Sequence, residues 1–175
     1  MTELEGTVLG VIWSREPITA YGVMQRFLAS PTRGWSSSAG AIYPAIKRLI
    51  REGLVQSTPE PGDKRSTRQL TLTSKGKSAL CKWLLELEEW MGGAVVDPVR
   101  TRINYIGALP RAQQLALVEN ARTNARAALE ELDGFVPDPT AHEPLGLEIA
   151  SRGARADVEA RLAWLDQVRA LLAER

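Results

Sequence analysis

The stretch from Ser36 to Val55, S-S-S-A-G-A-I-Y-P-A-I-K-R-L-I-R-E-G-L-V, narrowly limits what this chain can fold into. It begins with serines, which accept hydrogen bonds from the free amides of a helix start, and ends at Gly53, a favoured residue at helix ends. An aliphatic face recurs at helical spacing and comprises Ile42, Ile46 and Leu49. A neighbouring stripe carries Tyr43, Lys47 and Arg51, beside Arg48. The pattern predicts a helix with one apolar and one basic face.

Such a helix has what a DNA-reading element needs. Phosphates attract lysine and arginine, and base edges require side chains that reach into a groove. A surface helix with three basic residues is also, in many proteins, an ordinary solvated face. The rest of the chain has to distinguish these two interpretations.

Composition limits the class of protein. The chain has 175 residues, 44% of them hydrophobic, which is typical of one or two folded domains. Its single cysteine, Cys81, permits no intramolecular disulfide and fits a reducing cytoplasm. No stretch approaches the roughly 20 consecutive apolar residues of a membrane span, and the N-terminus is acidic where a signal peptide would be basic. The sequence therefore predicts a cytoplasmic protein with no membrane partner.

Charge is distributed unevenly along the chain. Residues 1–80 carry 11 Lys and Arg against 6 Asp and Glu, whereas residues 81–175 carry 11 against 15. The basic excess lies in the half that contains the predicted basic helix. This asymmetry is expected of a nucleic-acid-binding module joined to a second part.

The first 76 residues have the pattern of a winged helix-turn-helix. Apolar residues predict one helix from about residue 4 to 14, ended by Glu16-Pro17, and a second from Thr19 or Ala20 to Leu28. After the basic third helix, residues 54–58 and 67–72 favour strands, joined by a Pro/Gly turn with a basic tip. A plain exposed hairpin, charged for solubility, is the alternative interpretation of this wing.

Four runs of residues carry a resemblance to a known family. They are Tyr21-Gly22, G-A-I-Y-P-A-I-K-R-L at 40–49, E-G-L-V at 52–55 and L-T-S-K-G at 72–76. Together they resemble the PadR family of bacterial winged-helix transcriptional regulators, closely over residues 4–80. The later residues resemble, by their helices, the longer subfamily with a large C-terminal helical domain. Leu70 departs from the pattern, because family members commonly carry tyrosine there.

The second half of the chain reads as helices. Residues 76–91, 99–108 and 111–132 each show helical apolar spacing, and His142 lies in a proline-rich loop at 136–144. A long, nearly heptad stripe follows, and we predict that it pairs two copies of the chain: Leu147, Ala150, Ala154, Val158, Leu162, Leu165, Val168 and Leu172. The resemblance likewise implies dimerisation through the C-terminal helices.

The predicted fold is mainly α. It comprises a winged-helix DNA-binding domain over residues 1–76, with three helices and a two-stranded wing, and an all-α dimerisation domain over residues 77–175 that starts with a linker helix at 77–91. A twofold dimer doubles the DNA contacts and reads a palindrome whose half-sites are separated by about 34–36 Å or a multiple of it.

Candidate site residues follow from this arrangement. We predict DNA contacts from the second helix, the third helix and the wing: Tyr21, Ser37, Ser38, Tyr43, Pro44, Lys47, Arg48, Lys64, Arg65 and Arg68. The resemblance implies a homodimeric repressor that responds to a small aromatic or phenolic effector near the dimer interface. Trp83, Leu87 and Trp90 share one predicted helical stripe and are candidate effector contacts, although such stripes are also typical of a protein core.

Other classes of function have little support in the sequence. An enzyme is not expected, because the chain has no phosphate-binding glycine loop, no nucleophile motif and one histidine without matching ligand residues. No metal and no cofactor are predicted. The competing hypothesis is a winged-helix module that uses its basic helix to bind an acidic protein partner without recognising a DNA sequence.

Overall fold

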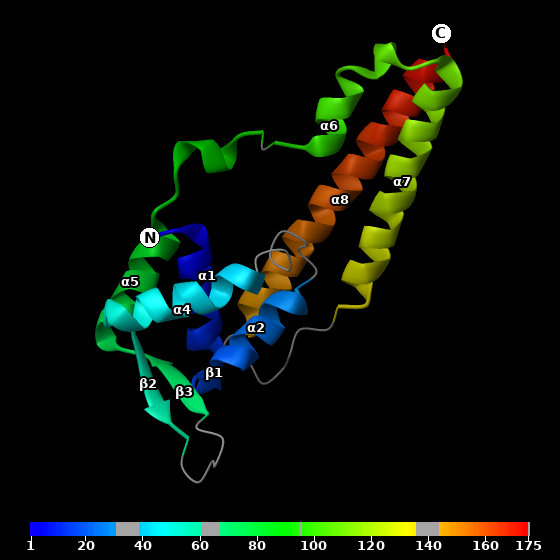
Figure 1. Ribbon diagram of the computed structural model, residues 1–175. Coiled ribbons are helices and arrows are strands. Elements are labelled where there is room, and N and C mark those ends of the chain that lie inside the picture. Colours follow the sequence, from blue (N-terminus) through cyan, green and yellow to red (C-terminus); the bar gives the residue numbers. More distant parts are fainter. Residues whose placement is uncertain (31–38, 61–66, 95, 136–143, 175) are drawn as a thin grey trace. The chain divides into compact units, whose positions relative to one another are not determined.

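The computed structural model describes residues 1–30, 39–60, 67–94, 96–135 and 144–174. They form a mainly α-helical protein with one small antiparallel sheet, which confirms the predicted fold class (Figure 1). The chain divides into two compact units, the first reaching Glu88 and the second beginning at Glu89. Among these residues, none of the helices combines the length and apolar character that a membrane crossing requires.

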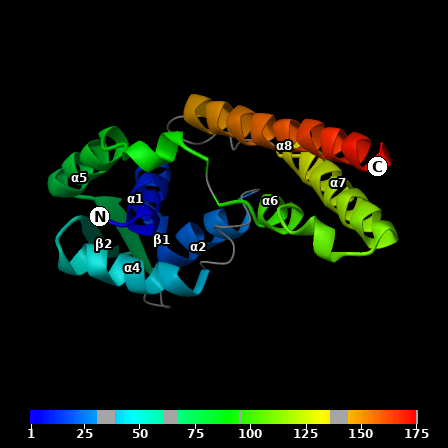
Figure 2. The same cartoon turned by 90° about the horizontal axis from the view of Figure 1, so that it is seen from above.

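Unit 1 contains four α-helices and three strands within its described residues. In chain order they are α1 (Glu3–Arg15), β1 (Ile18–Thr19), α2 (Ala20–Leu28), α4 (Ala39–Arg51), β2 (Val55–Pro59), β3 (Arg68–Leu72) and α5 (Ser74–Leu85). Helix α1 is central and contacts α2, α4, α5 and β3 (Figures 1 and 2).

The start of α1 is fixed by a capping box. The Thr2 hydroxyl accepts a hydrogen bond from the Glu5 amide at 3.2 Å, and the Thr2 amide donates to the Glu5 carboxylate at 3.0 Å. These bonds satisfy amides that have no partner within the helix. The helix ends at Arg15, because Glu16 is extended ahead of Pro17, as the sequence predicts.

A single apolar core holds unit 1 together. It combines one face of α1, α2 and α4 with the start of β2, alternate residues of β3 and one residue of α5: Val8, Leu9, Ile12, Val23, Phe27, Ile42, Ala45, Ile46, Leu49, Leu54, Val55, Leu70, Leu72 and Leu80. The three aliphatic residues predicted to face inward on the basic helix all belong to it. Burial of this face orients α4 in the domain.

The sheet has a strand that the sequence did not reveal. Strands pair in the order β1-β3-β2, all antiparallel, with Ile18 opposite Leu70 on one side of β3 and Ser57 opposite Leu70 on the other. The predicted wing contained β2 and β3 alone. Strand β1 has only two residues, too few for an alternating pattern to be recognised.

Two glycines have clear physical reasons in this fold. Gly53 follows α4 with a φ of 71°, a left-handed conformation that L side chains rarely adopt. In the L-T-S-K-G run, the Thr73 hydroxyl accepts from the Gly76 amide at 3.0 Å and caps α5. A Cβ at Gly76 would overlap the Leu54 carbonyl oxygen, so this helix start lies against the chain that enters β2.

Helix α5 is shorter than predicted. The expected helix over residues 76–91 ends at Leu85, and a 3-10 turn, η1 (Glu89–Gly92), follows. The linker helix assigned to residues 77–91 is therefore wrong beyond Leu85. No helix-breaking residue stands at this point. The helix ends close to the boundary between the two units, which local sequence patterns do not record.

Unit 2 consists of helices joined by short turns in its described residues. After η1 they are α6 (Pro98–Ile103), the 3-10 turn η2 (Ile106–Ala108), α7 (Arg111–Asp133) and α8 (Pro144–Ala173). Asp97 caps the start of α6, where its carboxylate accepts from the Val99 amide at 2.8 Å, and Pro98 occupies the first turn. The single helix predicted over residues 99–108 is wrong: α6 ends at Ile103, and the 3-10 turn η2 follows.

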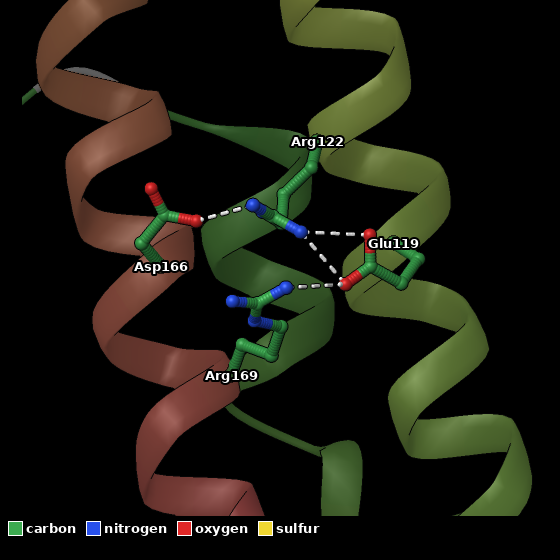
Figure 3. A network of polar contacts seen from close by, with 4 residues as sticks. All are labelled: Glu119, Arg122, Asp166 and Arg169. Carbon is green, nitrogen blue, oxygen red and sulfur yellow. Dashed lines mark hydrogen bonds and ion pairs between the residues drawn. The ribbon is translucent and has the colours of Figure 1, made fainter.

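Helices α7 and α8 lie side by side and are joined by a charge network around the buried Arg122 (Figures 1 and 3). Arg122 of α7 is only 6% exposed. Its guanidinium binds Glu119 at 2.7 Å and Asp166 of α8 at 2.7 Å, and Arg169 of α8 reaches Glu119 at 3.5 Å. A buried guanidinium needs such partners, because an unpaired buried charge is costly. The network therefore favours one register of α7 against α8.

Ion pairs also join other parts of unit 2. Arg161 of α8 binds the second oxygen of the Asp97 carboxylate at 2.8 Å, which links α8 to the start of α6. Arg155 of α8 pairs with Asp133 at the end of α7. Within the described part of this unit, four apolar residues are buried: Val118, Ala125, Leu132 and Leu165. Its apolar core is therefore much smaller than that of unit 1.

The contact between α1 and α5 can be tested at two glycines of α1. A Cβ at Gly6 would overlap the Trp83 ring, whereas a Cβ at Gly10 would meet nothing within 4 Å. We expect Gly6→Ala to lower the free energy of unfolding by about 1–3 kcal/mol through overpacking. Gly10→Ala should raise it by about 0.5–1 kcal/mol through helix propensity. Urea unfolding of both variants makes the comparison, and equal effects would contradict this packing.

Candidate nucleic-acid interface

The exposed face of α4 is the central feature of the candidate interface. Ile42, Ala45, Ile46 and Leu49 are buried on one side of the helix. At about 100° per residue, the opposite side carries Gly40, Pro44, Lys47 and Arg51, all of which are exposed. Tyr43 lies at the edge of this side and is also exposed. The predicted basic face is thus open to solvent in the single chain.

Pro44 lies inside α4 and does not end it. Proline has no amide hydrogen, so the Gly40 carbonyl lacks the hydrogen bond that residue 44 would otherwise donate. Both residues lie on the exposed side of the helix. The irregularity therefore falls on the solvent face and leaves the buried face continuous.

Arg48 is held differently from Lys47. Its Nε donates to a carboxylate oxygen of Glu5 at 2.8 Å, and the two side chains are 41% and 14% exposed. Glu5 is the same residue that completes the capping box of α1. One carboxylate therefore joins the start of α1 to the basic helix.

These contacts lower the pKa of Glu5. The main cause is the hydrogen bond from the Thr2 backbone amide, followed by the hydrogen bond from Arg48. Both partners favour the charged carboxylate, and they outweigh the opposing effect of burial. The spacing of Thr2 and Glu5 is the sequence signal of a capping box and could have identified this residue, but no local pattern indicates its contact with Arg48.

A second carboxylate joins α1 to the wing. Glu16, which follows α1, accepts a hydrogen bond from the Leu72 amide of β3 at 2.6 Å and pairs with Lys77 of α5 at 3.0 Å. Because β1 pairs with β3 only as far as Leu70, the Glu16 carboxylate satisfies an amide beyond the end of that short strand. Sequence reasoning assigned Glu16 no role beyond ending the helix.

Of the DNA contacts predicted on the wing, Arg68 is the one that lies among the described residues. Arg68 of β3 is exposed, and its Nε donates to the Ser57 hydroxyl of β2 at 2.8 Å. Its guanidinium also donates to the Ser57 carbonyl at 2.5 Å, so the side chain lies across the two strands. Tyr21, near the start of α2, is 61% exposed. Ser37, Ser38, Lys64 and Arg65 lie outside the described residues.

The predicted dimer stripe is divided between two environments. Leu165 is 0% exposed within its own chain, and Val158, Leu162 and Leu172 are half-buried. The first half of α8 is open by contrast, with large exposed side chains at Leu145, Leu147 and Ile149. Ala150 is exposed and Ala154 is half-buried. Much of the second half of the stripe is thus already covered by other residues of the same chain.

The three candidate effector residues do not share a helical stripe. Trp83 of α5 lies against Gly6, and its indole Nε1 donates to Glu3 at 3.3 Å. Leu87 lies after the end of α5 and is largely exposed, and the side chain of Trp90 lies outside the described part of the chain. Trp83 borders a cavity of about 230 Å³ with the core residues Leu49 and Leu54. Within the described ranges, no group of three or more metal-ligating side chains is found.

Known proteins are similar to this chain in sequence and in fold. Residues 8–82 match the family model described as the transcriptional regulator PadR-like family. A curated relative, the negative transcriptional regulator PadR of Bacillus subtilis (strain 168), is 27% identical over 135 residues, which span 77% of this chain and 73% of the relative.

Solved structures extend the fold similarity to nearly the whole chain. Bacillus subtilis PadR in complex with operator DNA has a TM-score of 0.82 at 22% identity, covering 98% of this chain and 99% of that one. The same protein in complex with p-coumaric acid gives 0.77 at 22% identity, covering 98% and 96%. The Vibrio cholerae virulence activator AphA gives 0.74 at 18% identity, covering 98% and 99%.

The lowered pKa of Glu5 predicts a pH-dependent contribution to stability. A carboxylate with a pKa lowered by folding stabilises the native state above its unfolded pKa, which is about 4.3, and this stabilisation is lost as pH falls through the folded value. We expect Glu5→Gln to lower the free energy of unfolding by about 1 kcal/mol at pH 7.

The difference between the parent and Glu5→Gln should shrink as pH falls below about 4. Urea unfolding at a series of pH values measures it. Glu86→Gln is a suitable control, because Glu86 makes an exposed pair with Lys82 at 3.4 Å and should change stability by less than about 0.5 kcal/mol. A Glu5 effect that stays constant down to pH 3 would contradict this assignment.

Proposed function

We propose that this chain is a PadR-like transcriptional regulator, whose family model residues 8–82 match, and that it acts as a homodimeric repressor that binds a palindromic operator. The observation that carries this proposal is the exposed face of α4, where Tyr43 and Lys47 lie opposite the buried aliphatic residues. A major groove admits one α-helix, and exposed cations can approach its phosphates while neighbouring side chains reach the bases.

The wing and α2 supply further contacts in this proposal. Lys64 and Arg65, which lie between β2 and β3 in the sequence, and the exposed Arg68 of β3 would contact phosphates beside the groove. The exposed Tyr21 at the start of α2 would donate to a further phosphate. The relative with operator DNA in its structure supports this arrangement, since its chain has the same fold.

A second copy of the chain would complete the regulator. Unit 2 buries four apolar residues within its described part, while Leu145, Leu147 and Ile149 stay exposed on the first half of α8. A unit with so small a core gains stability by covering such side chains against a partner. We therefore assign residues 77–175 to dimerisation, with the first half of α8 as the seam. In a dimer of two copies, each α4 would bind one half-site of the palindromic operator.

A small aromatic effector is the proposed signal for release. A relative has been solved with p-coumaric acid, and Trp83 offers an aromatic surface beside the cavity of about 230 Å³ in unit 1. Fluorescence titration with aromatic acids and phenols tests this part of the proposal. Quenching that is lost in Trp83→Phe would support it, and the absence of quenching by the whole panel would contradict it.

Selection of genomic fragments by the purified protein tests the central proposal. We expect enrichment of a palindrome, and fluorescence anisotropy on that duplex should show binding that weakens steeply with salt. Lys64→Ala and Arg65→Ala should each reduce the slope of log affinity against log salt by about 0.9. Indifference to every DNA fragment would instead favour a module that binds an acidic protein partner.

The dimer seam gives a separate prediction. Ile149→Glu places a charge on a residue that is 61% exposed in the single chain and would be buried in the proposed dimer. We expect this variant to be monomeric by light scattering and to lose about tenfold or more in operator affinity.

Leu28→Glu is the matched control for the seam. Leu28 is also a large exposed apolar residue, but it lies on α2, outside the residues assigned to dimerisation. This variant should stay dimeric by light scattering. A dimeric Ile149→Glu protein with unchanged affinity would exclude this part of α8 from the seam.

A further inference from the structure

The three basic residues of α4 have different environments. Lys47 and Arg51 are exposed on the side opposite the buried face, whereas Arg48 lies at the edge that faces α1 and donates to Glu5. Neither Lys47 nor Arg51 makes an ion pair with another described residue. Among the described residues, therefore, only Arg48 of these three cations is held by an ion pair.

We propose that Lys47 and Arg51 are the α4 cations that contact DNA, and that Arg48 is a positioning residue that Glu5 holds against α1. This inference rests on the proposed function and assigns roles within the same face. It adds Arg51 as a DNA contact and removes Arg48, which the sequence pattern alone had grouped with Lys47.

The geometry of the helix supports Arg51 as a contact. Tyr43, Lys47 and Arg51 follow one another every four residues along α4. At 1.5 Å per residue, the eight steps from Tyr43 to Arg51 span about 12 Å along the helix axis. A helix lying in the major groove with this face toward the DNA would therefore bring Tyr43, Lys47 and Arg51 to successive positions along the groove.

The contacts of Glu5 support a positioning role for Arg48. Glu5 is 14% exposed, is fixed by the Thr2 cap and accepts from Arg48 Nε at 2.8 Å. Transfer of Arg48 to a phosphate would leave a largely buried carboxylate without its cationic partner, which is unfavourable. The pair instead fixes the side of α4 next to α1, and so fixes the direction in which Lys47 points.

Salt dependence distinguishes the two roles. A cation that neutralises a phosphate contributes about 0.9 to the slope of log affinity against log salt, whereas a cation that only positions the helix contributes none. We expect Lys47→Ala and Arg51→Ala each to lower the slope by about 0.9. Arg48→Met should weaken binding about three- to tenfold with an unchanged slope.

A double-mutant cycle gives the second measurement. Glu5→Gln keeps an oxygen that can accept from the Thr2 amide and removes the charge that holds Arg48. Glu5→Gln should weaken DNA binding about as much as Arg48→Met, again with an unchanged slope. The double variant should be no weaker than either single variant, because both remove the same interaction. The combination of Lys47→Ala with Arg48→Met should be multiplicative.

Three results would overturn the inference. They are a slope that falls by about 0.9 in Arg48→Met, a slope that is unchanged in Arg51→Ala, and tighter binding by Glu5→Gln, which would mean that Glu5 competes with DNA for Arg48. Circular dichroism of each variant confirms that affinities are compared between folded proteins. Failure of the parent protein to bind any duplex is a distinct result, which would refute the proposed function and the inference together.

Discussion

The packing of α4 against α1 is the interaction on which the candidate interface depends. Ile42, Ile46 and Leu49 enter the core beside Val8, Leu9 and Ile12, and this burial fixes which side of α4 faces solvent. The basic residues are exposed because the aliphatic residues are buried. The same helix α1 contacts β3 and α5, so it is the common support of the basic helix and the wing.

Two carboxylates add directional contacts to the orientation that the apolar core gives to α4 and the wing. Glu5 at the start of α1 binds Arg48 of α4, and Glu16 just after its end binds the Leu72 amide of β3 and Lys77 of α5. Apolar packing is not directional, whereas a hydrogen bond to a charged group has a preferred distance and angle. The two ends of one helix thereby fix the orientation of both elements proposed to contact DNA.

The two units are stabilised in different ways. Unit 1 has one apolar core, whereas the described part of unit 2 relies on a few buried apolar residues and on ion pairs between helices, with Arg122 at the centre. Arginine suits this role because its planar guanidinium can bind two carboxylates at once. The pairs Arg122–Asp166 and Arg161–Asp97 specify how α8 lies against α7 and α6, and the exposed first half of α8 is left for the proposed second copy.

The sequence by itself determined the winged-helix order of elements and the buried and basic faces of α4, because helical and strand periodicities are local, and its L-T-S-K-G and Y-P runs carry the family resemblance. Only the tertiary structure decided the end of α5 at Leu85, the pairing of β1, the burial of Leu165 and the separation of Arg48 from Lys47. Each of these depends on a partner distant in the chain. Arg48 and Lys47 are adjacent in sequence, and what separates them is Glu5, 43 residues before Arg48.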